Sequence, residues 1–564
     1  MANRLTLDGS PVAQYGVDDA GRLTTITHGS STFSLAYDNA SRRLSLSYPN
    51  GIVTSYSYDA NSSLIGITSQ RGGSPVQQIS YTYDTVGNRT AKTVDSLLET
   101  YSYDPLSRLT GVARAGATPR RWSLAYDSVG NRLSGQADGI TLSGDFDQNN
   151  QLLSLTPGGK VHILGEVDEA ATVSVAGQPA RMTGARTFEA DVDVAPGTNS
   201  IPIVSTDGSG NSRTQVYEVE VGGDAATFEH DENGNTTQKV SGGHTWTYQW
   251  NALNQLTAVS KDGQPVATFK YDALGRRIEK VAGGVTYRFV YSGQDILRET
   301  QSSGATYTYI HGPGIDEPLA RLDQSGTAAY FHADGLGSII AMTDAAGNVT
   351  SRRQYDAWGN LEVGADQPGY AFTGREWDPE TGLYYYRARY YDPKIGRFIS
   401  EDPIRFAAGV NFYAYVGNRP TVMTDALGLQ MSPGYGTLPR PFSEPSRNPY
   451  LYFGASLQYG FGGVTVNVSP TGRVFIGPGG GFPESGFEGN VHIGTVNRSV
   501  CTAEDYDDFL EGASGGLSGY YGLGGGLALN PDGTTGTEGR GSEWVPALAS
   551  ARSRIAQRWN DFSN

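Results

Sequence analysis

The sequence predicts an all-β protein. We expect a long, spiralling sheet of repeated hairpins that is interrupted by a small β-sandwich and followed by a small, Gly-rich β domain. Three observations support this prediction. A short Tyr-Asp unit recurs along most of the first 430 residues, a stretch without the unit interrupts it at 157–224, and the unit never returns after residue 429. Repeats of this kind are typical of architectures in which each unit packs on its neighbours.

Composition agrees with a β-rich protein of several domains. The chain has 564 residues, which is too long for one ordinary core. It contains 75 Gly and 34 Tyr, and only 18 % of its residues are charged. The formal net charge of −16 argues against nucleic-acid binding by the repeats. No run of 18 apolar residues occurs, so no membrane-spanning helix is expected. The single cysteine, Cys501, excludes an internal disulfide.

The N-terminal sequence, "MANRLTLDGSPV", lacks the basic and apolar segments of a signal peptide. It begins directly in repeat-like sequence, so an extension of the natural protein further upstream is left open.

The repeated unit is a predicted hairpin. Examples are "YTYDTVGNRTAKT", "YSYDPLSRLTGVA" and "KYDALGRRIEKV". An aromatic residue in an alternating strand packs inward. Asp followed by Asn or Gly favours a tight turn, and the next strand again alternates apolar and polar residues. Successive hairpins should therefore pair edge to edge. A β-repeat array without any activity is one reading of this pattern.

The Tyr-Asp units resemble the YD repeats of the RHS family. The segment from "HADGLGSIIAMTD" through "FTGREWDPETGLYYYRARYYDPKIGRFISEDPI" to "DALGL", residues 332–429, resembles the RHS-associated core. That core also occurs in the C proteins of insecticidal toxin complexes. The resemblance covers roughly residues 1–429 outside the insert. It implies a hollow β-cocoon, closed at one end by the core, that encloses or presents a variable C-terminal toxin.

The insert at 157–224 has short alternating strands such as "TVSVAG" and "FEADVDV", with turns every 8 to 12 residues. This spacing predicts a small sandwich that resembles bacterial immunoglobulin-like domains. It fits a spacer on the outside of the shell or a contact module for a delivery partner. The predicted domains are first repeats (1–156), immunoglobulin-like insert (157–224), second repeats (225–331), RHS-associated core (332–429) and C-terminal effector (430–564).

The RHS resemblance also implies self-cleavage by a pair of aspartates. The matching residues are Asp402 in "GRFISEDPI" and Asp425 in "DALGL", and the cleaved bond joins Leu429 to Gln430. Arg397, in "GRF", is the candidate that orients or charge-balances the pair. The chemistry is reasonable because two nearby carboxylates cannot both ionise easily, so one is held protonated while the other activates water. Each Asp could alternatively be a turn residue without catalytic function.

One residue departs from the family pattern Asp-Pro-x-Gly-Leu. Ala426 replaces the proline, while the spacing from Asp to Leu is intact. Without proline the turn is less restricted, which implies slower cleavage at an unchanged bond.

Residues 430–564 are the predicted effector. After a Pro-rich linker, Gly-rich alternating strands predict an antiparallel meander or small barrel, with a short helix at "TAEDYDDFLEG" and a terminal helix at "VPALASARSRIAQRWNDF". His492 and Cys501 lie nine residues apart, but two such residues are more typical of structural positions. The acidic residues of "TAEDYDDFLEG" are scattered around a helix, which favours a solvated face over a cation site. "GRGSEW" resembles an ADP-ribosyltransferase only weakly. No cofactor or metal is expected.

Three classes therefore stay open for the effector: a soluble enzyme, a membrane-active toxin, and a binding or adhesion domain. The resemblance implies a secreted or surface-delivered protein that acts in a target cell. It also implies an immunity protein and a delivery component as partners. The alternative for the whole chain is an uncleaved cell-surface binding protein.

Overall fold

The computed structural model describes residues 4–7, 10–116, 120–137 and 140–433, together with the backbone of seven strands between residues 450 and 538. The chain forms two compact units, one spanning most of residues 1–439 and the other most of residues 440–564. In the described part of the chain, no helix is long and apolar enough to cross a membrane.

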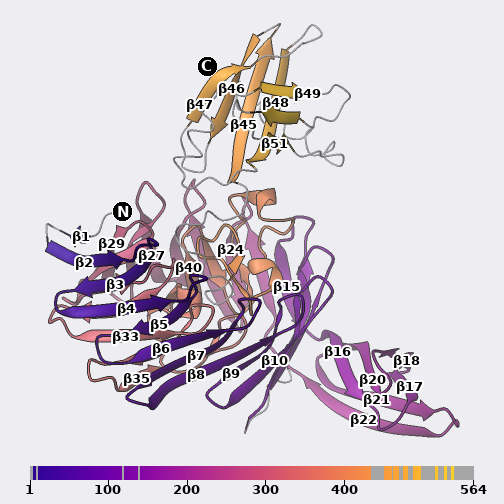
Figure 1. Cartoon of the computed structure of the whole chain (residues 1–564). Helices are drawn as coiled ribbons and strands as arrows, with labels where there is room; N and C mark the ends of the chain where they lie inside the picture. Colours follow the sequence, from indigo (N-terminus) through magenta and orange to yellow (C-terminus); the bar gives the residue numbers. More distant parts are fainter. Residues whose placement is uncertain are drawn as a thin grey trace. The chain divides into compact units, whose positions relative to one another are not determined.

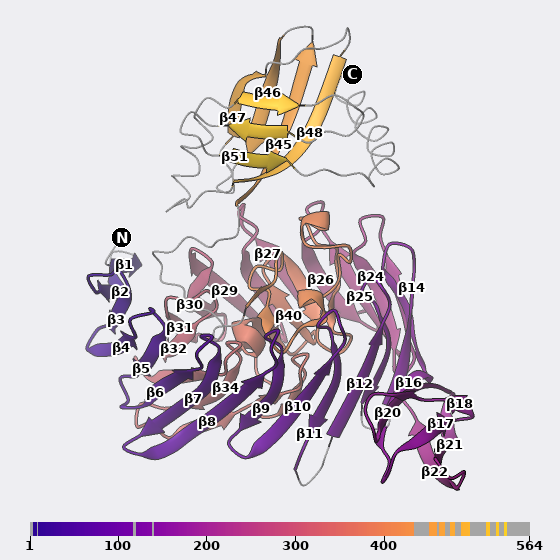
Figure 2. The same ribbon diagram turned by 45° about the vertical axis from the view of Figure 1, so that its right-hand side comes forward.

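One continuous antiparallel sheet of 28 strands dominates the first unit. Each strand pairs with the strand that follows it in sequence, and β15 pairs directly with β23 across the insert. Figures 1 and 2 show these strands following one another around a curved sheet. The prediction of an all-β shell of hairpin repeats is confirmed.

The strands of this sheet are β1 (Arg4–Leu7), β2 (Ser10–Val17), β3 (Leu23–His28), β4 (Ser31–Tyr37), β5 (Arg43–Ser47), β6 (Val53–Tyr58), β7 (Leu64–Arg71), β8 (Ser74–Tyr83), β9 (Arg89–Val94), β10 (Leu97–Tyr103), β11 (Leu109–Arg114), β12 (Arg120–Tyr126), β13 (Arg132–Ala137), β14 (Ile140–Phe146), β15 (Leu152–Pro157), β23 (Ala226–His230), β24 (Thr236–Ser241), β25 (His244–Trp250), β26 (Leu256–Lys261), β27 (Gln264–Tyr271), β28 (Arg277–Ala282), β29 (Val285–Ser292), β30 (Asp295–Gln301), β31 (Thr306–His311), β32 (Pro318–Asp323), β33 (Ala328–Ala333), β34 (Ile339–Thr343) and β35 (Val349–Arg352).

The Tyr-Asp pair has a structural role in each repeat. The tyrosine hydroxyl donates to a main-chain carbonyl of the preceding unit, as in Tyr83 to Leu64 at 2.8 Å and Tyr271 to Leu256 at 2.6 Å. The aspartate then closes the turn, because one of its carboxylate oxygens accepts two main-chain N–H groups. This arrangement recurs from repeat to repeat, so the tyrosine joins neighbouring hairpins and the aspartate shapes each one.

The insert forms two small sheets with an apolar core of their own. One sheet holds β16 (Gly159–Glu166), β20 (Thr187–Val194) and β19 (Arg181–Met182). The other holds β18 (Gln178–Pro179), β17 (Ala171–Val175), β21 (Gly197–Asp207) and β22 (Ser212–Val221). Val173 and Phe188, one from each sheet, share this core. The predicted sandwich fits this arrangement, and its immunoglobulin-like nature stays a prediction.

The residues after β35 pack between the two halves of the curved sheet. Tyr384 and Tyr386 share a core with Leu64 and Ile79 of the first half, while Tyr385 shares one with shell residues of the second half. Figures 1 and 2 show β40 between the N-terminal strands and strands β24–β29. This tyrosine-rich segment therefore gives the shell a solid interior at the position that holds the candidate site.

The elements of this segment are β36 (Gln354–Tyr355), β37 (Leu361–Val363), β38 (Gly369–Tyr370), η1 (Phe372–Gly374), β39 (Glu376–Asp378), β40 (Leu383–Tyr386), β41 (Arg389–Asp392), β42 (Arg397–Phe398), η2 (Arg405–Ala407), η3 (Val416–Asn418), β43 (Met423–Thr424) and β44 (Ser432–Pro433). Strands β38 to β42 form one antiparallel sheet in chain order.

The second unit contains a seven-stranded antiparallel sheet in the order β47-β46-β45-β48-β51-β50-β49. Its strands are β45 (Tyr450–Tyr459), β46 (Gly462–Val468), β47 (Val474–Gly479), β48 (Phe487–Val496), β49 (Gly515–Ser518), β50 (Gly526–Leu529) and β51 (Thr535–Glu538). The predicted antiparallel strands are present, and β48 returns to pair with β45 on the side opposite β46. Both predicted helices lie outside the described residues.

Candidate functional site

Asp402 and Asp425 come together in the interior of the first unit. Asp402 follows strand β42 and Asp425 follows strand β43, and each is only 2 % exposed. One guanidinium nitrogen, Arg389 Nη2, contacts both carboxylates, at 2.7 Å from Asp402 Oδ2 and 3.1 Å from Asp425 Oδ2. Two aspartates separated by 23 positions in the sequence therefore share one buried cation.

Arg389 opens strand β41, and every nitrogen of its buried guanidinium has a partner. Nε donates to the carbonyl of Gly428 at 2.6 Å, and Nη1 donates to the carbonyl of Phe412 at 2.8 Å. The guanidinium carbon lies 3.6 Å from the ring centre of Phe398, a cation–π contact. Burial lowers the pKa of Arg389, although the two carboxylates act against this shift. These contacts fix the position of the Arg389 guanidinium independently of the two aspartates.

Asp402 sits in a turn of its own. Its Oδ1 accepts the N–H of Ile404 at 3.0 Å, which leaves Oδ2 for Arg389. Burial raises the pKa of Asp402 to about 6, and the nearby charge of Asp425 adds to the rise, whereas Arg389 and the Ile404 N–H oppose it. Burial therefore favours the protonated form of the Asp402 carboxyl group.

Asp425 contacts the predicted cleavage site directly. Its Oδ1 accepts the N–H of Leu429 at 2.9 Å and the N–H of Gln430 at 3.1 Å. The Gly428 N–H closes a β-turn on the Asp425 carbonyl at 3.3 Å. The nitrogen of the Leu429–Gln430 bond therefore lies within hydrogen-bonding distance of one member of the pair.

Arg397 lies on the other face of its strand, away from this site. Its guanidinium donates to the carbonyl of Asn150 and lies 5.0 Å and 4.8 Å from the ring centres of Phe146 and Tyr413. Successive side chains of a strand point in opposite directions. Phe398 faces Arg389, so Arg397 does not. The charge-balancing group at the pair is Arg389, not the Arg397 that the sequence suggested.

Sequence reasoning missed Arg389, although its segment carries a signal. "YYYRARYYD" places two arginines in a run of aromatic residues. In the interior of a protein both faces of a strand are covered, so residues that alternate between the two faces are all buried. A buried arginine requires an anionic partner. That argument identifies a buried cation, but only the fold shows which carboxylates it meets.

The candidate residues of the C-terminal domain give no comparable geometry. His492 lies on strand β48, of which only the backbone is described. Cys501, the acidic segment 502–512 and the "GRGSEW" segment lie outside the described residues. Within the described ranges, no group of three His, Cys, Asp or Glu residues has the arrangement needed to hold a metal ion.

The family model named Teneurin YD-shell matches residues 29–193 and 211–421. The chain belongs to this family. The match covers most of the shell and most of the segment that carries the Asp pair, and it confirms the resemblance to YD-repeat proteins.

Toxin proteins are among the curated relatives. The tRNA3(Ser)-specific nuclease WapA of Bacillus spizizenii is 32 % identical over 220 residues, which cover 36 % of this chain and 9 % of the relative. The double-stranded DNA deaminase toxin A of Burkholderia cenocepacia is 34 % identical over 186 residues, covering 28 % and 13 %. Toxin protein Tse5 of Pseudomonas aeruginosa is 34 % identical over 157 residues, covering 22 % and 12 %. The chain spans about a tenth of the length of these relatives.

Among solved structures, the crystal structure of TcdB2-TccC3-Cdc42 matches with a TM-score of 0.36 and 19 % identity, over 75 % of this chain and 24 % of that one. The family match identifies the chain as a YD-shell protein, and two of the relatives given above are named as toxins.

Proposed function

We propose that this YD-shell protein cuts its own chain between Leu429 and Gln430, with Asp402 and Asp425 as the catalytic residues. The observation that carries the proposal is the position of Arg389 Nη2, which contacts both carboxylates while Asp425 also contacts the amide of Gln430. A buried pair of carboxylates beside a peptide bond is the arrangement that aspartic peptide hydrolysis requires.

The charges at the site favour one proton on the pair. If both carboxylates were ionised, one guanidinium would face two negative charges in a buried position, which is costly. Asp425 accepts two N–H groups and contacts Arg389, so its ionised form is well solvated by the protein. Asp402 accepts one N–H group, and burial raises its pKa. Asp402 therefore holds the proton, and Asp425 is the base.

The proposed reaction needs only water and these two groups. Asp425 removes a proton from a water molecule, whose oxygen attacks the carbonyl carbon of Leu429. Asp402 donates its proton to the carbonyl oxygen as negative charge develops there. When the tetrahedral intermediate collapses, the carbon–nitrogen bond breaks and Asp425 passes its proton to the nitrogen of Gln430. The intermediate's hydroxyl proton returns to Asp402, so both catalytic groups end in their starting states.

The released segment, residues 430–564, is proposed to be a toxic effector that the shell encloses until delivery. The two relatives named as toxins support this role. The proposed domains remain 1–156, 157–224, 225–331, 332–429 and 430–564. An effector of this kind needs an immunity protein in the producing cell and a delivery component that carries it to the target cell. Its own chemistry is not assigned.

Synthesis of the protein by cell-free translation in ¹⁸O-enriched water tests the chemistry and the position of the cut together. Hydrolysis by the Asp pair predicts a shell fragment that ends at Leu429 with one solvent oxygen in its new carboxylate, and a second fragment that begins at Gln430. Cleavage at another bond, or a Leu429 end without solvent oxygen, would overturn the proposal. An intact chain would favour the alternative of an uncleaved binding protein.

A further inference from the structure

Three successive carbonyls that precede the proposed cleavage site are bound by three successive residues of one hairpin, the two residues of its turn and the first residue of β41. Arg387 Nη1 donates to the carbonyl of Ala426, the Ala388 N–H donates to that of Leu427 at 3.2 Å, and Arg389 Nε donates to that of Gly428 at 2.6 Å. We propose that this β40–β41 turn is a substrate clamp, in which Arg387 positions the segment 426–428 for cleavage. The inference rests on the proposed self-cleavage and deepens it.

The turn is held in an unusual conformation that presents its donors. Tyr386 and Arg389 pair across the hairpin, so Arg387 and Ala388 form a two-residue turn. Arg387 has a φ of 55°, in the left-handed region that a long side chain rarely adopts. Backbone strain of this kind is commonly found at ligand clamps and active sites. Here it directs the Arg387 guanidinium and the Ala388 N–H toward the same segment of chain.

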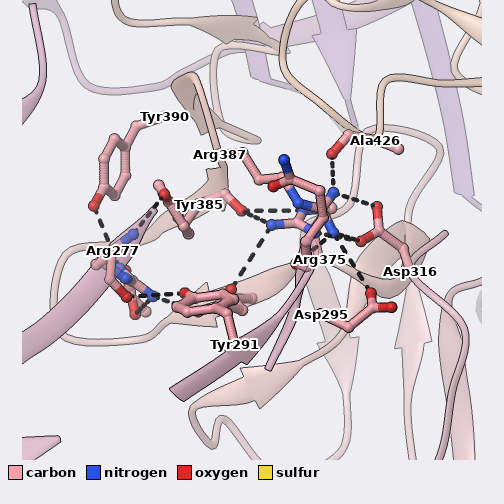
Figure 3. A network of polar contacts seen from close by, with 12 residues as sticks. Arg277, Tyr291, Asp295, Asp316, Arg375, Tyr385, Arg387, Tyr390 and Ala426 are labelled. Atoms are coloured by element: carbon pink, nitrogen blue, oxygen red, sulfur yellow. Dashed lines mark hydrogen bonds and ion pairs between the residues drawn. The ribbon is translucent and has the colours of Figure 1, made fainter. Parts of the chain in front are cut away.

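A buried carboxylate fixes the Arg387 guanidinium. Asp316, 3 % exposed, accepts hydrogen bonds from Arg387 Nη2 at 2.6 Å and Arg387 Nη1 at 3.2 Å, and it also pairs with Arg375. Figure 3 shows Arg387 between Asp316 and the Ala426 carbonyl, with Asp295 nearby. Because the guanidinium is held on both edges, the loss of Asp316 should free it from Ala426.

The clamp binds main-chain carbonyls of the segment, and it requires glycine at one position. Gly428 has a φ of +67°, and a Cβ added there would lie 2.2 Å from the Tyr386 carbonyl oxygen. By contrast, the side chain of Leu427 is 38 % exposed. Positions 426 and 427 should therefore accept other side chains, whereas Gly428 should not be replaceable by any residue with a Cβ.

The two sides of the bond are held unequally. On the C-terminal side, the described contacts beyond Gln430 include a two-residue ladder between β43 and β44, where Thr424 pairs with Ser432. The Thr424 hydroxyl also bonds Ser432 at 3.4 Å, and both residues of β44 are exposed. On the N-terminal side, two of the three clamp bonds come from guanidinium groups, the buried one of Arg389 and that of Arg387, whose side chain is 10 % exposed. After cleavage, residues 426–429 should stay in the clamp and occupy the site, so each shell cleaves once.

The test follows cleavage by intact mass over time in purified, folded Arg387→Gln and Asp316→Asn, with Arg288→Gln as the matched control. Arg288 pairs with Glu279 at the surface of the shell. Loss of a charge-assisted bond to Ala426 should slow cleavage about 10- to 100-fold in both clamp variants, with no change in the control. The effect of Arg387→Gln should shrink in an Ala426→Pro background, because proline restricts the same turn.

Cleavage of both clamp variants at the parent rate would overturn the clamp. So would an Arg387→Gln variant that slows cleavage by the same factor with proline at position 426 as with Ala426. If the parent cleaves and Asp425→Asn does not, such a result leaves the Asp pair standing and removes only the clamp. Retention is read by hydrogen exchange at the Ala388 amide. Protection of this amide from exchange that persists after cleavage supports the retention of residues 426–429 in the clamp. Loss of this protection on cleavage contradicts it.

Discussion

The same aspartate turn occurs in the shell and at the candidate site, with different consequences. In the repeat turn at Asp344, Oδ1 accepts the N–H of Asn348 at 2.8 Å and Oδ2 accepts the Asn348 side chain at 3.0 Å. These bonds from Asn348 are the main reason that the pKa of Asp344 lies below its usual value. At Asp402, Oδ1 accepts the N–H of Ile404, two residues ahead, and Oδ2 contacts Arg389 of another hairpin.

Burial and a shared cation, more than turn geometry, separate the two kinds of aspartate. In the Asp344 turn, the bonds to the carboxylate come from within the turn itself. Asp402 and Asp425 are buried and depend on a single guanidinium from another hairpin, so one carboxyl group is favoured in the protonated form. The proposed catalytic pair thus differs from the repeat turns in its burial and in the cation that both of its carboxylates contact.

The largest effect should come from removing either carboxylate of the pair. Asp402→Asn should reduce the rate of cleavage by at least about 10³-fold, because an amide cannot act as the acid. Asp344→Asn, the matched change in a repeat turn, should cleave at the parent rate. Intact mass after timed incubation measures both, and equal rates in the two variants would erase the distinction between the turns.

Removal of the shared cation should have the next largest effect. Arg389→Met removes the cation from the pair and should stop cleavage. In an uncleavable Asp425→Asn background it leaves the buried Asp402 carboxylate without a cation, which should destabilise the fold by about 3–5 kcal/mol. Arg276→Met, at the repeat pair with Asp272 where the side chains are 22 % and 21 % exposed, should cost at most about 1 kcal/mol. Urea unfolding of both arginine variants in the uncleavable Asp425→Asn background compares their losses in the free energy of unfolding. Similar losses would contradict the role assigned to burial.

The cleavage rate should fall as pH rises through about 6, because Asp402 must be protonated and its pKa is raised to about 6. The same shift makes protonation of Asp402 favour the folded state. This contribution to stability is fully present below pH 3.8, the ordinary value, and is lost as pH rises through about 6. The pH dependence of the free energy of unfolding, compared between Asp425→Asn with and without Asp402→Asn, isolates this contribution. A cleavage rate that does not change between pH 5 and 7 would argue against Asp402 as the acid.

The smallest effect should come from restoring proline at position 426. Ala426 is the second residue of the turn that Gly428 closes on Asp425, a position where proline is favoured. Ala426→Pro should raise stability by about 0.4–1 kcal/mol and accelerate cleavage severalfold, through a less flexible turn. Thermal unfolding and the rate of cleavage test this, with Ala345→Pro, at the same position of the Asp344 turn, as a control that should leave cleavage unchanged.

The sequence predicts the shell well because its information is local. Alternation and the Tyr-Asp turns specify each hairpin, and each hairpin pairs with the next, as the Tyr83 and Tyr271 hydroxyl contacts show. The candidate site is different because its parts come from three separate segments. Motif resemblance supplies Asp402 and Asp425, but the choice between Arg389 and Arg397 depends on which face of a strand points inward, and this requires the fold.

The most direct test of the central claim is the intact mass of the purified protein under denaturing conditions, beside Asp425→Asn. The account predicts two fragments from the parent, separated between Leu429 and Gln430, and a single chain of 60.2 kDa from the variant. A single 60.2 kDa chain from both proteins would contradict it. The buried pair would then be a structural feature of the shell, and the protein an uncleaved binding scaffold.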